Sequence, residues 1–240
     1  PENAKKLIDT GVTGIAYETV TSSDGSMPLL APMSTIAGQL AFVVGSYHLL
    51  KHNKGKGVMI GHMDDMDPRV VTVIGAGVAG TQSILKAIDN KALVKVVDSS
   101  QSKLDDLKSK YGTENIEYIL SSKDSIQVSV NESDLVIGSV YVVGKEAPKV
   151  VTKDMLSSMN PGTVMVDVSI DQGGCFETSK PTTHDSPTFL ENDIVHYCVT
   201  NMPGAVPLTA TEALNKVSLS YVENLATVSY THLTLPTMMS

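Results

Sequence analysis

Residues 70–80 read VVTVIGAGVAG, and this stretch decides the fold. A run of strand-favouring residues leads directly into the spacing Gly-x-Gly-x-x-Gly, formed by Gly75, Gly77 and Gly80. In such a strand–turn–helix unit, the first glycine permits a tight turn and the second lets the backbone approach a pyrophosphate. The third lets the helix pack closely on the strand. The stretch therefore predicts a dinucleotide site at the N-terminus of a helix that opens near Val78.

An acidic residue follows at the distance that this motif expects. Residues 93–97 form the next apolar run, and Asp98 ends it about 20 residues beyond the glycines. A carboxylate there accepts hydrogen bonds from ribose hydroxyls and repels a 2′-phosphate, which favours NAD over NADP. Lys103 lies close enough to approach the adenosine end. The alternative is a glycine-rich turn that binds no nucleotide.

Further apolar runs predict the rest of a doubly wound α/β fold. Their apolar residues occupy successive positions, which is typical of strands buried on both faces of a parallel sheet. Helical or loop stretches separate most of the runs, as in a Rossmann-type sheet that binds ligands at the carboxyl ends of its strands. The six expected strands are residues 70–74, 93–97, 116–120, 135–137, 164–168 and 194–199. Outside them, the pattern predicts helices at 3–10, 34–51 and 209–225 and a short strand at 12–17, with Ser34 as a helix N-cap.

Composition excludes several classes of partner. The net charge is −8, which argues against nucleic acid as the main partner, and Arg69 is the only arginine, so no cluster of arginines can form. No apolar run reaches the about 18 residues that a membrane span needs. Cys175 and Cys198 have no metal-ligand spacing, so we expect no metal site and a reducing, cytoplasmic location.

A second glycine-containing loop follows a late strand. Residues 166–174 read VDVSIDQGG, and the loop falls at the carboxyl edge where the nicotinamide end of a cofactor would lie. Asp171 in this loop is placed to handle a proton or to bind a cation. Alternatively it caps the loop through local backbone hydrogen bonds. Asp167, on the strand itself, is predicted to be structural.

The histidines and cysteines suggest a second interpretation of the site, which is less favoured than cofactor binding. His184 and His196 each invite a catalytic role, although a single histidine is more often a hydrogen-bonded structural residue. A nucleophile pair formed by Cys175 and His184 is conceivable, but cofactor chemistry explains the site without it. Asn201 and Met202 follow the last expected strand and offer polar and apolar contacts near the cofactor cleft.

Several runs together resemble one family. The chain resembles the alanine dehydrogenases, whose family also includes the nicotinamide nucleotide transhydrogenase α subunit. The matching stretches are residues 15–20, 28–34, 74–77, 170–177, 181–184 and 201–207. The run DQGGC at residues 171–175 and the run PTTH at 181–184 favour alanine dehydrogenase over transhydrogenase.

The resemblance implies an activity and a set of site residues. The activity is reversible, NAD-dependent oxidative deamination of L-alanine to pyruvate and ammonia by a protein that usually assembles as a homohexamer. Asp171 matches the catalytic aspartate. The implied cofactor contacts are Ser34, Val78, Asp98, Lys103, Ser121 or Ser122, then Val140 and Tyr141, then Val168, Ser169, Ile170 and Asp171, and finally Val199, Thr200, Asn201 and Met202.

The resemblance also implies a division of the chain. Residues 31–205 are expected to form the NAD-binding domain, residues 1–30 part of a substrate domain, and residues 206–228 a helix returning to it. Residues 229–240 do not resemble the family and are expected to be a non-native tail. The family's substrate-binding Arg and Lys and its catalytic His would lie upstream of Pro1. Two alternatives stay open: a transhydrogenase-type NAD(H) domain and a non-enzymatic NAD-binding module.

Overall fold

The computed structural model describes residues 2–61, 63–142 and 145–227. They fall into two compact units. The larger spans Ser34–Ala205, and the smaller combines Pro1–Met33 with Val206–Ser240. The tail expected at residues 229–240 lies outside the described residues. None of the described helices is both long and apolar enough to cross a membrane.

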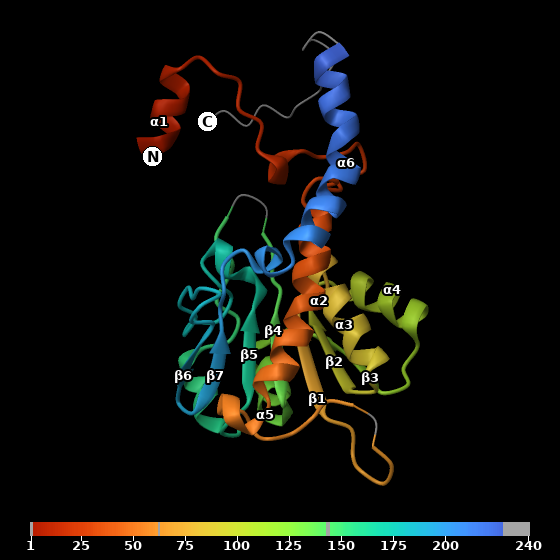
Figure 1. Ribbon diagram of the computed structural model, residues 1–240. Coiled ribbons are helices and arrows are strands. Elements are labelled where there is room, and N and C mark those ends of the chain that lie inside the picture. Colours follow the sequence, from red (N-terminus) through yellow and green to blue (C-terminus); the bar gives the residue numbers. More distant parts are fainter. Residues whose placement is uncertain (1, 62, 143–144, 228–240) are drawn as a thin grey trace. The chain divides into compact units, whose positions relative to one another are not determined.

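The larger unit contains a seven-stranded sheet in the order β3-β2-β1-β4-β5-β7-β6 (Figure 1). All neighbouring pairs are parallel except β6 and β7, which are antiparallel. The strands are β1 Val70–Ile74, β2 Leu93–Asp98, β3 Ile116–Leu120, β4 Leu135–Gly138, β5 Val164–Asp167, β6 Thr188–Glu191 and β7 Ile194–Tyr197. The predicted Rossmann-type parallel sheet is therefore confirmed.

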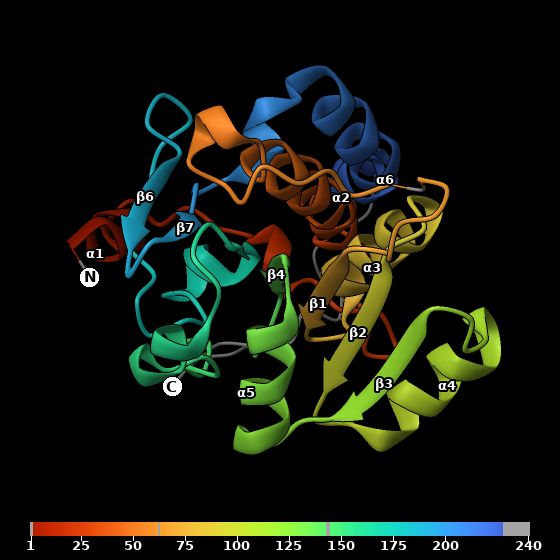
Figure 2. The same cartoon turned by 90° about the horizontal axis from the view of Figure 1, so that it is seen from below.

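Both faces of this sheet are buried, as the successive apolar positions predict. Val94 and Val96 of β2 belong to the core on one face, and Val97 belongs to the core on the other. Helices α3 Val78–Asp89 and α4 Gln101–Tyr111 contribute to the first core, together with α2 Ala31–His48. Helix α5 Lys123–Glu132 and the 3-10 segment Lys153–Ser158 contribute to the second core. Figure 2 shows α2 and α3 on one side of the strands and α5 on the other.

Helix α2 begins earlier than the sequence predicts. It starts at Ala31, so Ser34 lies within the first turn and the predicted N-cap is wrong. Pro32 is compatible with this start because a proline in the first helical turn removes no intrahelical hydrogen bond. The helix ends at His48, not at residue 51, where a short 3-10 segment Lys51–Asn53 begins.

Two glycines bring α2 very close to its neighbours in the sheet unit. A Cβ atom at Gly38 would lie 2.0 Å from the carbonyl oxygen of Ala79, at the start of α3. A Cβ atom at Gly45 would lie 2.5 Å from Cδ1 of Leu135, at the start of β4. Helix α2 therefore runs from the carboxyl edge of the parallel strands to their amino edge, with Ser34 at the carboxyl-edge end.

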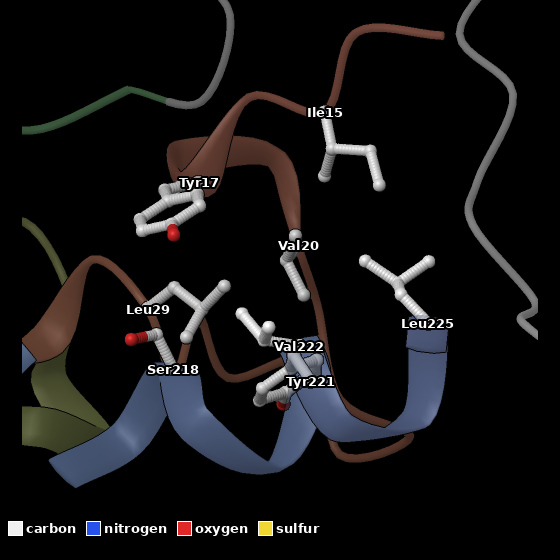
Figure 3. A pocket seen from close by; sticks show the side chains of 8 residues that line it. All are labelled: Ile15, Tyr17, Val20, Leu29, Ser218, Tyr221, Val222 and Leu225. Carbon is white, nitrogen blue, oxygen red and sulfur yellow. The ribbon is translucent and has the colours of Figure 1, made fainter. Parts of the chain in front are cut away.

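The smaller unit contains α1 Glu2–Asp9, the 3-10 segment Tyr17–Thr19 and α6 Pro207–Thr227. The strand predicted at residues 12–17 is wrong, because the described part of this unit offers no strand to pair with it. A small apolar cavity of about 70 Å³ lies within the unit (Figure 3). Its walls are formed mainly by apolar and aromatic side chains, namely Ile15, Tyr17, Val20, Leu29, Ser218, Tyr221, Val222 and Leu225.

A neutral histidine of strand β7 is built into the core. His196 is completely buried, its Nδ1 donates to the carbonyl oxygen of Ile194 at 3.1 Å, and its Nε2 accepts from the hydroxyl of Thr178 at 2.8 Å. Its ring stacks on Phe189 with a centroid distance of 4.9 Å. Burial lowers the pKa of His196, since desolvation disfavours the imidazolium. This arrangement identifies His196 as a structural residue.

We expect the stability of the chain to fall in mild acid. The unfolded histidine takes up a proton near a pKa of about 6.5, whereas the buried ring resists protonation, so the unfolded state binds more protons below that pH. The free energy of unfolding should therefore decrease between about pH 7 and pH 5, measured by urea denaturation.

The variant His196→Gln should flatten this pH dependence, although part of it remains because burial also lowers the pKa of His48. The exposed His52→Gln is the matched control for loss of an imidazole. An unchanged slope in His196→Gln would show that this ring does not titrate with unfolding.

Candidate functional site

Apart from Ser34 on α2, the predicted site segments follow parallel strands of the sheet unit. Gly75 follows β1, Asp98 ends β2, Ser121 follows β3, and Val140 comes shortly after β4. Residues 168–171 follow β5 and residues 199–202 come shortly after β7. Because these six strands run in the same direction, the segments lie at one edge of the sheet. The strand order reverses between β1 and β4, where doubly wound sheets bind their ligands.

The turn after β1 requires glycine at two of its positions, Gly75 and Gly80. Gly75 has a φ of +97°, and a Cβ atom there would lie 2.5 Å from the carbonyl oxygen of Ser139. A Cβ atom at Gly80 would lie 1.8 Å from the carbonyl oxygen of Gly75, so helix α3 packs directly on the turn. At Gly77 no atom lies within 4 Å of the Cβ position, which leaves open space in front of the helix N-terminus. The turn therefore fits a pyrophosphate.

Asp98 holds this turn in place. Its Oδ2 accepts from the backbone N–H of Ala76 at 2.7 Å, and its Oδ1 accepts from the backbone N–H of Ser100 at 2.8 Å. The side chain is 8% exposed. An ionised carboxylate has about four acceptor positions, so further positions are left for ribose hydroxyls. The sequence predicts a ribose contact, and the structure adds a role in fastening the glycine turn to β2.

The residues predicted to lie near the adenosine are found at the starts of helices α4 and α5. Lys103 lies in the first turn of α4, which Ser100 caps by accepting from the backbone N–H of Lys103 at 3.4 Å. The hydroxyl of Ser122 accepts from the backbone N–H of Ser125 at 3.0 Å and caps α5. Ser121, which precedes this cap and follows β3, is therefore the better candidate of the two serines for an adenine contact.

Three segments meet on the other side of the switch point. The hydroxyl of Ser169 donates to the carbonyl oxygen of Val140 at 2.8 Å. The backbone N–H of Asn201 donates to Oδ2 of Asp171 at 3.3 Å. These contacts join the loops after β4, β5 and β7, which carry the predicted nicotinamide-side residues. One boundary is corrected: Val168 begins a 3-10 turn, because strand β5 ends at Asp167.

The structure contradicts the nucleophile pair. The thiol of Cys175 is fully buried, and its Sγ lies 3.5 Å from Oδ1 of Asp167. Burial raises the pKa of this thiol well above its usual value, and the negative charge of Asp167 adds to the effect. The ring of His184 instead contacts the carbonyl oxygen of Asn201 through Nε2 at 3.2 Å. Cys175 is therefore an unreactive core residue.

Two residues of the site were missed by sequence reasoning. The hydroxyl of Ser139 donates to the carbonyl oxygen of Gly75 at 2.7 Å and joins β4 to the glycine turn. The ammonium of Lys149 donates to the carbonyl oxygens of Gly173 and, at 2.7 Å, Gly174. A small residue directly after β4 is a usable signal for Ser139. The contact of Lys149 spans 25 positions and has no local signature.

The described residues contain no group of three or more His, Cys, Asp and Glu side chains that could hold a metal ion. The fold and the site together define a dinucleotide-binding α/β domain of the Rossmann type.

Comparison with known proteins identifies the family. Residues 41–237 match the family described as "Alanine dehydrogenase/PNT, C-terminal domain", and the chain belongs to this family. The chain is 49% identical over 222 residues to an alanine dehydrogenase of Halomonas elongata, which covers 92% of the chain and 60% of that relative. It is 48% identical to an alanine dehydrogenase of Mycobacterium tuberculosis, over 92% of the chain and 59% of the relative. The chain thus spans about three fifths of the length of these curated relatives.

Solved structures agree with the family. An L-alanine dehydrogenase matches with a TM-score of 0.89 and 43% identity, over 94% of this chain and 62% of the other. A transhydrogenase from Sinorhizobium meliloti matches with a TM-score of 0.83 and 21% identity, over 98% of this chain and 68% of the other. At that identity, the second match shows a shared fold alone.

Two glycine variants should differ in stability, because Gly80 is closely packed and Gly77 faces open space. Gly80→Ala should lower the free energy of unfolding by about 1–3 kcal/mol, because its methyl group would overlap the carbonyl group of Gly75. Gly77→Ala should cost less than about 1 kcal/mol, because no atom occupies the space of its methyl group. Urea denaturation of the two variants measures the difference. Equal losses would contradict the close packing of α3 on the turn.

Proposed function

We propose that this chain binds NAD(H) along the carboxyl edge of its sheet and is the NAD-binding part of an alanine dehydrogenase. NAD is the cofactor of the family to which the chain belongs. The observation that carries the proposal is the glycine turn of residues 75–80, fastened by the Asp98 carboxylate and open at Gly77. The identity of 48–49% to alanine dehydrogenases supports the substrate, L-alanine.

The residues of this edge have distinct places in the proposal. Gly75 and Gly77 form the turn that approaches the pyrophosphate, Gly80 lets α3 pack against this turn, and Ser34 contributes from the first turn of α2. Val78, Asp98, Lys103 and Ser121 surround the adenosine. The nicotinamide end is lined by Val140, Tyr141, Val168, Ser169, Ile170, Asp171, Val199, Thr200, Asn201 and Met202. The hydrogen bonds from Ser169 to Val140 and from Asn201 to Asp171 support this grouping.

In the proposed reaction, bound NAD supplies the acceptor for the hydride that leaves the Cα atom of L-alanine. Asp171 is the catalytic residue of this chain. Its carboxylate stabilises the positive charge that develops on the substrate nitrogen, and it manages protons as water adds to the imine carbon. Loss of ammonia then gives pyruvate. The backbone N–H of Asn201 orients the carboxylate of Asp171 through Oδ2.

Family membership also supports assembly as a homohexamer, a cytoplasmic location and a role in alanine breakdown. It further supports the expected division of the chain, with residues 31–205 as the NAD-binding domain and residues 1–30 and 206–228 as parts of a substrate domain. Light scattering of the purified protein tests the oligomeric state directly.

The choice of NAD over NADP should depend on Asp98. Asp98→Ala should weaken NADH binding at least about tenfold, because it removes a charged hydrogen-bond acceptor. It should also relax discrimination against NADPH, because the charge that repels a 2′-phosphate is lost. Fluorescence titration with NADH and NADPH measures both affinities.

Asp98→Asn is the matched control. It keeps one oxygen acceptor, for the backbone N–H of either Ala76 or Ser100, and loses the charge, so it should also relax the discrimination against NADPH. Unchanged affinities for both nucleotides in both variants would exclude Asp98 from the cofactor site.

The 240-residue chain should bind NADH saturably without reducing NAD when alanine is added. The reason is that Asp171 is the one catalytic group that we assign to it, and the relatives are longer. The test is nucleotide binding by fluorescence together with an absorbance assay of NADH formation. Alanine-dependent turnover would show that this chain holds every essential group. For a longer protein that contains this chain and matches the relatives over their whole length, absence of alanine turnover would favour the transhydrogenase-type alternative.

A further inference from the structure

A buried carboxylate lies beneath the loop that carries Asp171. Asp167 is the last residue of β5 and has no exposed surface. Its Oδ1 accepts from the backbone N–H of Ser169 at 2.9 Å, and its Oδ2 accepts from the backbone N–H groups of Cys175 at 2.8 Å and Phe176 at 3.3 Å. The hydroxyl of Ser179 also donates to Oδ2. The carboxylate is thus held entirely by uncharged donors.

A buried carboxylate without a cationic partner is unfavourable for the stability of the folded chain. Among the described residues, no lysine or arginine forms an ion pair with Asp167. Removing an unpaired carboxylate from water remains unfavourable even when its hydrogen bonds are made. Desolvation accordingly raises the pKa of Asp167, while its hydrogen bonds lower it. An apolar side chain here would leave the backbone N–H groups of Ser169, Cys175 and Phe176 without this acceptor, so the carboxylate serves the loop rather than the apolar core.

The hydrogen bonds of Asp167 close the loop of residues 168–176 at both ends. Oδ1 binds the beginning of the loop at Ser169, and Oδ2 binds its end at Cys175 and Phe176. The chain passes so close that a Cβ atom at Gly174, where φ is +79°, would lie 2.8 Å from Oδ2. Asp171 lies between these anchored ends.

We propose that Asp167 is a positioning residue, whose buried carboxylate fixes the loop of residues 168–176 so that Asp171 and its neighbours meet the nicotinamide end of the cofactor. This inference rests on the proposed NAD(H) site. It goes beyond the structural role that the sequence predicts, because it assigns Asp167 a specific effect on one half of the ligand. Neutralising the carboxylate disturbs the nicotinamide side and spares the glycine turn.

A second buried carboxylate provides a matched control at the opposite edge of the sheet. Asp134 precedes β4 and is 9% exposed. It accepts from the backbone N–H of Val70 at 3.1 Å and from the ammonium of Lys56 at 2.9 Å. Asp134→Asn therefore also removes a buried charge that binds backbone, but at the amino ends of the strands, away from the loop.

The experiment compares two ligands of the 240-residue chain, NADH and ADP. ADP carries the adenosine and two phosphates but neither the nicotinamide nor its ribose. Asp167→Asn should weaken NADH binding about tenfold, the effect typical of removing a residue that orients a site from behind. ADP binding should stay within about twofold, because its contacts lie at the glycine turn and Asp98. Asp134→Asn should lower the free energy of unfolding but leave the NADH-to-ADP affinity ratio unchanged.

Any one of three results from Asp167→Asn and Asp134→Asn would overturn the inference. These are equal losses for both ligands in Asp167→Asn, the same ratio change in Asp134→Asn, or unchanged NADH affinity in a folded Asp167→Asn. If Asp167→Asn does not fold, Ser179→Ala removes one donor and keeps the charge, and it should shift the ratio in the same direction by about twofold. No shift in that variant also overturns the inference. If the parent chain binds neither ligand, the proposed function fails, and the inference fails with it.

Discussion

The approach of helix α3 to strand β1 is the constraint on which the site depends. A Cβ atom at Gly80 would lie 1.8 Å from the carbonyl oxygen of Gly75, so the helix can begin directly behind the turn only if both positions are glycine. That contact places the helix N-terminus against open space at Gly77. Helix α2 adds a second close approach at Gly38, which brings Ser34 to the same edge. Backbone contacts, with no side chain between them, therefore create the surface to which we assign the pyrophosphate.

Two buried carboxylates organise the loops on either side of this turn in the same way. Asp98 ends β2 and Asp167 ends β5, and each accepts from the backbone N–H two positions further along the chain. Each also accepts from a glycine-containing loop, at Ala76 and at Cys175 respectively. A carboxylate at a strand end can thus turn the chain locally and bind a second segment at once. These two side chains therefore hold the loops at this edge in place from within the fold.

Much of the sheet could be predicted because its strands are buried on both faces and consist of consecutive apolar residues. Strand β6 escaped prediction, since it is a short edge strand paired on one side and only partly buried. The strand predicted at residues 12–17 has the right residues but no pairing partner in the described part of its unit. Ser34 looks like an N-cap by sequence, but the helix begins at Ala31. These errors concern boundaries and partners, which propensity alone does not determine.

The sequence by itself determined the glycine turn, the acidic residue at the end of the second strand and the parallel sheet that carries them. These features depend on local backbone sterics and on hydrophobic patterning, and residues that are neighbours in the sequence determine both. Only the tertiary structure decided three sets of hydrogen bonds. Asp98 binds the backbone N–H of Ala76, and the backbone N–H of Asn201 binds Asp171, 30 positions away in the sequence. Asp167 binds the end of the loop that follows it, at Cys175. Those hydrogen bonds form because the strand order brings distant strand ends to one edge, and strand order is a property of the folded sheet.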